Sequence, residues 1–303
     1  MKTVRALLDY GIEAFEQAGL SYGHGTTNAL DEAAWLILHA LGLPLDQLNA
    51  HLDRPLPDAQ WKAARALLDE RVRTRKPAAY LTHEAWLGPH RFYVDERVIV
   101  PRSFIAEWLW KPRKPGTVPD FGWRDRGLSP VSVLDLCTGS GCLAILAALA
   151  YPRAKVDAAD LSEDALAVAA RNVRDYGLEG RVTLLKSDLF SALGGRKYDL
   201  ILSNPPYVKA ASMRKLPDEY RKEPAMALAS GVDGLDHVRA ILAAAPAHLA
   251  PGGLLVVEIG HNRKALERAY PGLPFEWPKA SAGAGYVFVL PRSALEKGGR
   301  AGG

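Results

Sequence analysis

From residue 131 onward, short apolar runs alternate with longer stretches of helical periodicity. The runs that predict strands are 131–137, 155–160, 182–187, 199–203, 254–259 and 285–290. The stretches that predict helices are 141–150, 163–176 and 234–249. Strands that are separated by helices of this length favour a parallel, doubly wound α/β sheet. We therefore expect one α/β domain over residues 131–291.

The first 130 residues have a different pattern. Apolar residues recur at three- and four-residue steps around Ala33–Leu41 and Trp61–Val72, which predicts a small helical domain over residues 1–85. Apolar pairs and triplets flank the turn residues Gly88-Pro89 and Asp95-Glu96, which predicts a β-hairpin within 86–100. Prolines and glycines in 111–130 indicate a loop, so residues 86–130 form a hairpin and linker. The glycine-rich end, 292–303, predicts a disordered tail.

Composition excludes several classes of protein. No apolar run reaches the roughly 20 residues that a membrane helix needs, and no signal peptide precedes the first helix, so we expect a cytoplasmic protein. Cys137 and Cys142, the only cysteines, make neither a disulfide framework nor a zinc site, and we expect both to be reduced and buried, with no metal bound. The net charge of +4 is a weak indication of an acidic partner.

The first predicted strand ends in a glycine-rich turn, Thr138-Gly139-Ser140-Gly141-Cys142, which lets the backbone approach a ligand. Gly139, Gly141 and Ala144 also fit the weak dinucleotide fingerprint. Asp160 ends the second strand, where a carboxylate can accept hydrogen bonds from both hydroxyls of a ribose. A ribose is common to NAD and S-adenosylmethionine, so Asp160 does not distinguish them.

Three further residues near the strand ends are cofactor candidates. Asp135 suits the cationic methionine end of S-adenosylmethionine better than a pyrophosphate, although a carboxylate that braces the loop is the alternative. Asp188 can accept a hydrogen bond from an adenine amino group, or can cap a turn. Leu189 can cover a ring face.

The fourth predicted strand leads into Asn204-Pro205-Pro206-Tyr207. Two prolines fix the backbone and remove two N–H donors, so the Pro205 carbonyl is held beside the Asn204 side-chain carbonyl. Two such acceptors can bind both hydrogens of a planar NH2 group, and Tyr207 can stack on its face. We therefore predict a substrate site at Asn204–Tyr207, with Asn204, Pro205 and Tyr207 as catalytic residues and Asn204 also near the cofactor.

This arrangement suits methylation of an amide or aniline-type nitrogen. The lone pair of such a nitrogen is delocalised, which makes it a poor nucleophile. Acceptors out of the amide plane favour a pyramidal nitrogen whose lone pair points at the methyl group, so positioning and electrostatics drive an in-line displacement.

With both motifs placed, the chain resembles the protein-glutamine methyltransferases that modify translation factors and ribosomal proteins. The resemblance runs over roughly residues 30–290. Besides the two motifs it includes Tyr80–Thr82, Val94–Arg102, Glu223-Pro224, Ala227-Leu228 and Gly231–Leu235.

Within this family, Arg102 is followed by Ser103-Phe104-Ile105-Ala106-Glu107 rather than by the Pro-Asp-Thr-Glu of release-factor enzymes. The chain is in this respect similar to the branch that acts on the third protein of the large ribosomal subunit, as it is in Glu84-Ala85-Trp86 and Leu216–Pro224. Phe104 departs from the proline expected there. Arg102 and Glu223 match family positions without an assigned role.

The resemblance implies a seven-stranded, doubly wound class I (Rossmann-like) methyltransferase domain that binds S-adenosylmethionine. It also implies a ribosomal protein substrate. We expect the helical domain 1–85 and the hairpin to dock that substrate, since the other domain has its own sheet and cofactor site. Basic residues exceed acidic ones in the segments 86–130, 196–225 and 261–303, where contact with ribosomal RNA and an ordinary solvated surface are the alternatives.

The alternatives are a release-factor glutamine methyltransferase and an adenine methyltransferase of nucleic acid, which can share the Asn-Pro-Pro-Tyr motif. A nucleic-acid enzyme needs a strongly basic face, whereas residues 1–85 carry 9 Lys and Arg against 11 Asp and Glu. An NAD-dependent dehydrogenase or a non-catalytic ribosome-binding module leaves Asn204–Tyr207 unexplained.

Overall fold

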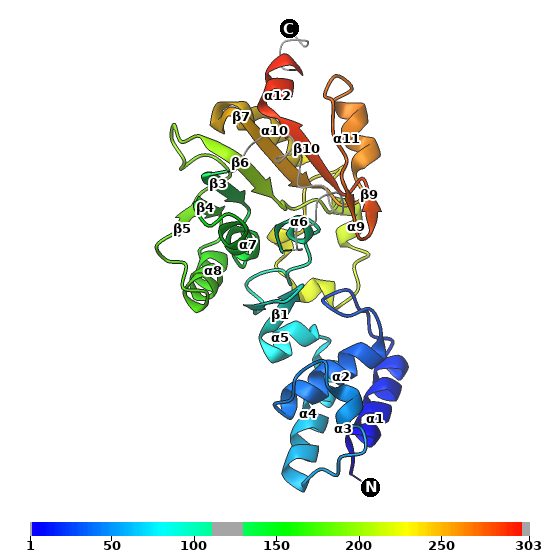
Figure 1. The fold of residues 1–303 in the computed structure, drawn as a ribbon. Helices are drawn as coiled ribbons and strands as arrows, with labels where there is room; N and C mark the ends of the chain where they lie inside the picture. The colour runs from blue at the N-terminus through cyan, green and yellow to red at the C-terminus, as the bar shows by residue number, and fades with distance from the viewer. Residues whose placement is uncertain (1, 111–129, 299–303) are drawn as a thin grey trace.

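The computed structural model describes residues 2–110 and 130–298, which form two lobes joined by a narrow waist (Figure 1). The N-terminal lobe is helical, and the C-terminal lobe is built on a sheet. The hairpin strand β1 lies between them (Figure 1). The division of the chain into domains near residue 85 stays a prediction from the change in sequence periodicity.

The helical lobe packs three long helices around one apolar core. Its helices are α1 (Val4–Gln17), α2 (Ala29–Ala40), α3 (Leu48–His51), α4 (Asp58–Thr74) and α5 (Ala78–Thr82). The Thr3 and Asn28 side chains accept hydrogen bonds from the first turns of α1 and α2, as N-cap residues do. Leu7, Leu36 and Leu68 are fully buried between the three helices, so the predicted amphipathic pattern is confirmed.

The hairpin is formed by β1 (Glu84–Leu87) and β2 (His90–Tyr93), with Glu84 opposite Tyr93. The expectation that Val98–Val100 also belongs to a hairpin strand is wrong. The Val98 carbonyl accepts a hydrogen bond from the Tyr80 hydroxyl, and the Val100 amide donates to Glu223, so side chains replace the strand partner. Helix α6 (Ala106–Trp110) follows, and the loop expected over 111–130 lies, apart from residue 130, outside the described residues.

The central sheet has the strand order β10-β7-β6-β3-β4-β5. Its strands are β3 (Ser132–Leu136), β4 (Lys155–Asp160), β5 (Val182–Lys186), β6 (Tyr198–Ser203), β7 (Leu249–Glu258) and β10 (Val287–Pro291). All neighbours are parallel except β10, which pairs antiparallel with β7. The α/β class and every predicted strand are therefore confirmed, with changes at the ends, the largest at β7, which begins five residues earlier than predicted.

Alternate residues of each strand face opposite layers of helices. Val133 and Leu200 pack with α7 (Cys142–Ala150), α8 (Glu163–Asp175) and α6 on one face. Leu134 and Ile201 pack with α10 (Asp236–His248) and α11 (Arg263–Ala269) on the other. A sheet that is covered on both faces explains the nearly continuous apolar runs in the sequence.

Two expectations at the C-terminal end need correction. The sheet has six strands in the described part of the chain rather than seven, and Glu276 makes only an isolated antiparallel bridge to Val289 of β10, at the open edge. The tail does not become irregular at residue 292, because Arg292–Gly298 form α12. Burial of Ala294 and Leu295 against the sheet stabilises this helix.

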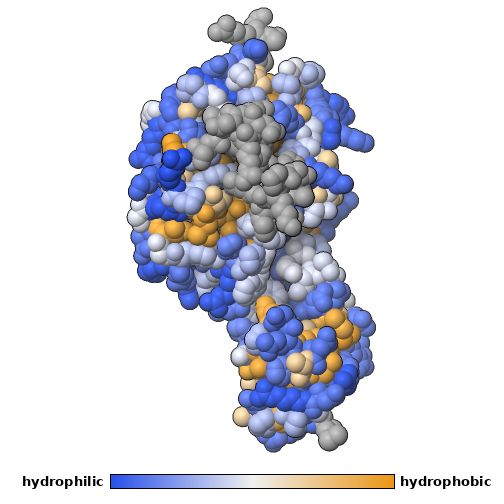
Figure 2. Space-filling model, viewed as in Figure 1, coloured by the Kyte–Doolittle hydropathy of each residue, from blue (hydrophilic) through white to orange (hydrophobic). Residues whose placement is uncertain are grey.

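The remaining elements are short and lie in the connections after β6 and β7. They are α9 (Ala210–Met213), the 3-10 turns η1 (Tyr220–Lys222) and η2 (Ala225–Ala227), β8 (Lys279–Ala280) and β9 (Gly283–Ala284). The face of the molecule in Figure 2 is mostly hydrophilic, with some apolar side chains on each lobe. Within 2–110 and 130–298, no helix has the length and apolar character to span a membrane.

Candidate active site

The candidate site lies where the direction of strand succession reverses. From β3 the chain proceeds through β4 and β5 to one edge of the sheet, whereas β6, β7 and β10 lead to the other. Loops that leave the carboxyl ends of β3 and β6 therefore diverge and open a crevice, the usual ligand position in open α/β sheets. The glycine-rich turn follows β3 and Asn204 follows β6, so the two predicted motifs meet there.

Three neighbouring cavities occupy this crevice. We call the first the cofactor pocket; its empty space amounts to about 750 Å³ including the open mouth. The second, the amide pocket, holds about 1050 Å³ including open solvent, and a smaller loop pocket lies against the glycine-rich turn. Ile99 and Asn204 line all three cavities, so the cavities meet at these residues.

The cofactor pocket contains most of the residues expected to bind a nucleoside. Gly139, Asp160, Asp188, Leu189 and Asn204 line it. Asp160 accepts hydrogen bonds from the Gly139 amide at 2.8 Å and from the Ser162 amide at 2.9 Å. Each carboxylate oxygen keeps further acceptor capacity, which fits ribose hydroxyls.

Asp188 is exposed at the pocket and Leu189 is half-buried, with a left-handed φ of 46°. Such a backbone is uncommon for a leucine, and strain of this kind is concentrated at ligand sites. These positions suit the roles expected from the sequence, an acceptor and an apolar cover.

The loop pocket contains the remainder of the glycine-rich turn. Thr138, Ser140 and Cys142 line it, together with Cys137, which sequence reasoning did not select. Cys137 is half-buried rather than buried, whereas Cys142 is buried as expected. Burial raises the pKa of the Cys142 thiol to about 12, so it stays protonated near neutral pH.

Two expected cofactor residues brace the turn instead of facing a cavity. Asp135 is fully buried, and its Oδ2 accepts hydrogen bonds from the Thr138 hydroxyl at 2.6 Å and the Ala144 amide at 3.0 Å. Its Oδ1 is buried and has no hydrogen-bond partner among the described residues. Burial raises its pKa to about 7. Gly141 has a φ of 80°, and a Cβ there would lie 3.1 Å from the Ala169 Cβ of α8. Gly141 thus permits close helix packing and does not line any of the three cavities.

The Asn-Pro-Pro-Tyr segment separates the cofactor pocket from the amide pocket. Pro206 lines the cofactor pocket, whereas Pro205 and Tyr207 line the amide pocket. Pro206, which we expected on the substrate side, therefore faces the other cavity. The two prolines restrict the backbone, and consecutive residues of this tetrapeptide line different cavities.

Asn204 is the residue whose environment points most directly to a ligand. Its Oδ1 atom is buried and accepts no hydrogen bond from the described residues. Buried acceptors normally have a partner, because an unpaired one loses hydration without compensation. An amide oxygen kept unpaired at the junction of the cavities is therefore suited to a donor from a bound molecule.

Tyr207 is held by residues that the sequence did not single out. Its carbonyl accepts a hydrogen bond from Asn262 Nδ2 at 2.8 Å. A Cβ at Gly260 would lie 2.7 Å from the Tyr207 ring, so only glycine allows this approach. The isolated glycine and the asparagine, 53 and 55 residues beyond the tyrosine, carry no local sequence signal of this contact.

Glu258, at the end of β7, contacts the hydroxyl group of the same tyrosine. It is nearly fully buried, and its Oε1 lies 3.5 Å from the Tyr207 hydroxyl, which donates to it. The Ser103 hydroxyl and Phe104 amide donate to its Oε2 at 2.7 and 2.9 Å. Burial outweighs these hydrogen bonds and raises the Glu258 pKa to about 7.

Arg102 and Glu223 form a paired contact at the wall of the amide pocket. The Arg102 guanidinium donates to both carboxylate oxygens of Glu223, at 2.5 and 2.7 Å. Burial by itself would raise the Glu223 pKa, but the hydrogen bonds from Arg102, together with the nearby His24 ring, outweigh it and lower the pKa to about 2. The pair thus joins the linker to the segment after β6, a structural role that sequence reasoning left open.

The cofactor pocket also has a rim that sequence reasoning missed. Arg97 and Val98 of the linker, Pro224 and Met226 of the segment around η2, and His237 of α10 line it. The only sequence feature that could have indicated these rim residues was the match to family positions at Val94–Arg102 and Glu223-Pro224. In the described part of the chain no group of three His, Cys, Asp or Glu side chains is arranged to hold a metal ion.

Comparison with known families agrees with this architecture. The family described as Methyltransferase small domain matches residues 128–231, and the PrmC N-terminal domain family matches residues 6–82. The catalytic domain of hMettl16 in complex with the MAT2A 3′UTR hairpin 1 is similar in structure, with a TM-score of 0.50. That alignment covers 95% of this chain and 90% of the other at 15% identity, which establishes a shared fold.

Relatives match over nearly the whole chain. The ribosomal protein uL3 glutamine methyltransferase of Neisseria meningitidis serogroup B is 53% identical, covering 97% of this chain and 95% of its own length. The protein of the same name from Burkholderia pseudomallei is 51% identical, covering 97% and 96%.

Proposed function

Because this chain belongs to the family of ribosomal protein uL3 glutamine methyltransferases, we propose that it transfers a methyl group from S-adenosylmethionine to the side-chain amide nitrogen of a glutamine in large-subunit ribosomal protein 3 (uL3). The observation that carries the proposal is the buried, unpaired Asn204 Oδ1 where the cofactor pocket meets the amide pocket. We assign the activity to the cytoplasm.

The cofactor pocket suits S-adenosylmethionine in its donor and acceptor groups. The Asp160 carboxylate would hold the ribose hydroxyls, with Leu189 against the adenine ring and Asp188 near its amino group. The Thr138–Ser140 turn and the loop pocket would hold the methionine end. When bound, S-adenosylmethionine supplies an electrophilic methyl group on a cationic sulfur.

The residues of the amide pocket prepare the nucleophile. Asn204 Oδ1 and the Pro205 carbonyl would accept the two amide hydrogens of the substrate glutamine, while the Tyr207 ring packs against the amide. Acceptors fixed before the reaction stabilise the positive charge that develops on nitrogen and need no reorganisation. As the new N–C bond forms, the bond between the methyl carbon and the cationic sulfur breaks, its electron pair stays on sulfur, and S-adenosylhomocysteine leaves as a neutral thioether. The methylated nitrogen becomes acidic and releases a proton to water, so no strong base is required beforehand.

The test uses purified enzyme, labelled S-adenosylmethionine and three acceptors in parallel: uL3, a peptide chain release factor and double-stranded DNA. We expect label in uL3, and fragment-ion mass spectrometry should locate it on a glutamine side chain. Label in the release factor alone would contradict the proposal and identify the enzyme as a release-factor glutamine methyltransferase. Label in DNA alone would replace protein methylation by adenine methylation.

A contact with ribosomal RNA is a further prediction from the basic segments. Label transfer to uL3 in an assembling large subunit should then depend on salt more steeply than transfer to free uL3.

A further inference from the structure

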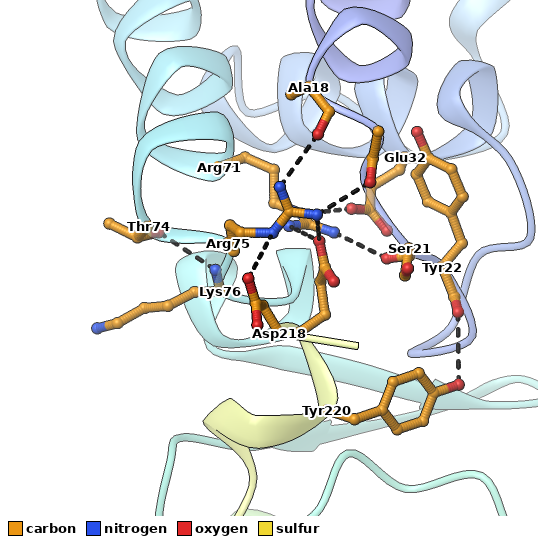
Figure 3. A network of polar contacts seen from close by, with 12 residues as sticks. Ala18, Ser21, Tyr22, Glu32, Arg71, Thr74, Arg75, Lys76, Asp218 and Tyr220 are labelled. Carbon is orange, nitrogen blue, oxygen red and sulfur yellow. Dashed lines mark hydrogen bonds and ion pairs between the residues drawn. The ribbon is translucent and has the colours of Figure 1, made fainter. Parts of the chain in front are cut away.

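The segment 216–224, which follows β6 and α9, forms one wall of the amide pocket. Leu216 and Tyr220 line that pocket directly. The other side of the wall contacts the helical lobe: the His24 ring lies 4.2 Å from the Tyr220 ring, and the Tyr220 hydroxyl donates to the Tyr22 carbonyl at 3.4 Å (Figure 3). The wall is therefore built between the two lobes.

Close packing at this contact depends on a glycine of the helical lobe. A Cβ at Gly23 would lie 2.3 Å from the Tyr220 hydroxyl oxygen, and the φ of Gly23 is 121°. No other residue type adopts that backbone readily. The approach of the helical lobe to Tyr220 is thus built into the backbone.

A buried charge cluster fixes the same wall one residue earlier. Glu219 is fully buried, and its Oε1 lies 3.0 Å from Arg75 Nη2 and 3.6 Å from Arg71 Nη1. Arg71 is also fully buried and donates to Glu32 of α2 at 2.5 Å. Figure 3 shows both arginines, from the C-terminal end of α4, directed at the wall.

A second contact crosses the lobes at the end of the segment. The His24 Nε2 lies 3.6 Å from Glu223 Oε2, next to the Arg102–Glu223 pair. Arg102 lines the amide pocket. The wall is thus attached to the helical lobe on both sides of Tyr220, by Glu219 before it and by Glu223 after it.

The free-energy cost of burying the Glu219 carboxylate ties the position of the wall to the arginines of the helical lobe. Burial of a carboxylate costs several kcal/mol unless a cation compensates it. Within the described residues, Glu219 has its compensating cations on α4 and at its C-cap, in the other lobe. Neither Glu219 oxygen accepts a well-oriented hydrogen bond there, so charge attraction rather than hydrogen-bond geometry holds it.

We infer that Glu219, held by Arg71 and Arg75, is a positioning residue that makes the helical lobe a structural part of the amide pocket. This inference rests on the proposed function, because it concerns where the substrate amide is placed. The helical lobe then does more than dock a protein substrate: it sets the distance between Tyr220 and the reacting amide at Asn204.

The test compares Glu219→Gln with Glu70→Gln in the full-length enzyme. Glu70 also pairs with an arginine, Arg73 on α4, but that pair is largely exposed. Single-turnover methyl transfer is measured at saturating S-adenosylmethionine and saturating uL3, together with both dissociation constants. We expect Glu219→Gln to lower the saturated rate at least about tenfold, because a misplacement of about 1 Å can cost ~10² in rate. Affinity for S-adenosylmethionine should stay within about twofold, and Glu70→Gln should resemble wild type.

Glu219→Gln could instead keep the wild-type rate at saturation and bind uL3 less tightly. That result would overturn the inference and show that the helical lobe only docks the protein substrate. If that variant unfolds, Arg75→Gln and Arg75→Lys replace it, since the Arg75 side chain is 28% exposed whereas Glu219 is fully buried. Arg75→Lys keeps the charge and should retain more of the rate than Arg75→Gln. Equal, wild-type rates in both would also refute it.

A second readout is independent of the reaction. Amide hydrogen exchange in residues 216–224 should speed up in Glu219→Gln and not in Glu70→Gln. If wild-type enzyme fails to methylate glutamine, the proposed function fails, whereas exchange still decides whether Glu219 orders the wall. Unchanged exchange in Glu219→Gln would refute the inference separately.

Discussion

Replacing Asn204 with alanine should separate catalysis from stability, because the Asn204 Oδ1 has no hydrogen-bond partner among residues 2–110 and 130–298. Most active-site substitutions remove interactions that also support the fold. Here the acceptor is already desolvated and unpaired, and its partner is expected to arrive with the substrate. The variant should therefore lose turnover while the enzyme keeps its fold.

The magnitudes follow from these contacts. An unpaired buried acceptor costs ~1–3 kcal/mol, and Asn204→Ala removes that cost together with a few packing contacts. We expect a melting temperature equal to wild type or up to about 4 °C higher. Loss of one preorganised polar group typically lowers the rate by ~10²–10³, about 2.7–4 kcal/mol of transition-state stabilisation. Asn204→Asp keeps an acceptor and should retain more activity than alanine.

The assay is single-turnover methyl transfer to uL3 at saturating S-adenosylmethionine, combined with calorimetry of cofactor binding and thermal unfolding. Asn49→Ala, at an exposed position of α3, is the matched control. Cofactor affinity should change by no more than a few-fold in either variant. A near-wild-type rate in Asn204→Ala, with the methyl group still on a glutamine side chain, would refute the proposed mechanism even though the family assignment stands.

Three further substitutions test other parts of the site. Asp160→Ala should weaken S-adenosylmethionine binding by about 1–3 kcal/mol in calorimetry, which is the scale of lost hydrogen bonds to a charged group. Unchanged affinity would show that Asp160 does not bind the cofactor. Gly260→Ala should displace the Tyr207 ring and lower kcat with little change in cofactor affinity, and a wild-type kcat would show that the ring position is unimportant. Burial raises the pKa of Glu258 from 4.5 to about 7, so its contribution to stability is present at low pH and lost as pH rises through 7. Glu258→Gln should therefore narrow the drop in melting temperature between pH 5.5 and pH 8, and an unchanged drop would assign the pH dependence to other groups.

The strands and the two motifs could be predicted because their signals are local. Residues 155–160 alternate between a buried and a less buried face, and the expected strand has the same bounds in the structure. The strand before Asn204 was predicted one residue short. From these strand ends alone, the meeting of Gly139 and Asn204 at one edge of the sheet could be foreseen.

The parts that could not be predicted depend on residues far apart in the sequence. Arg71 and Glu219 are separated by 148 positions, and nothing near either residue indicates that both charges are buried together. The sequence leaves open whether Asp135 binds the cofactor or braces the turn. Its Oδ2 accepts hydrogen bonds from Thr138 of the turn and Ala144 of α7, whereas its buried Oδ1 has no partner among the described residues. Only packing distinguishes these roles.

The two faces of the Asn-Pro-Pro-Tyr segment have a consequence for inhibition. Pro206 and Pro205 border different cavities that meet at Asn204, so the two cavities are a short distance apart along the chain. A compound that joins an adenosine-like group to a primary carboxamide by a short linker should occupy both at once. Its second group would bind at a high effective concentration once the first is seated. Such a compound would have to match the spacing between the cofactor pocket and the amide pocket. Enzymes that have a nucleoside pocket but no adjoining amide pocket should bind it far less tightly.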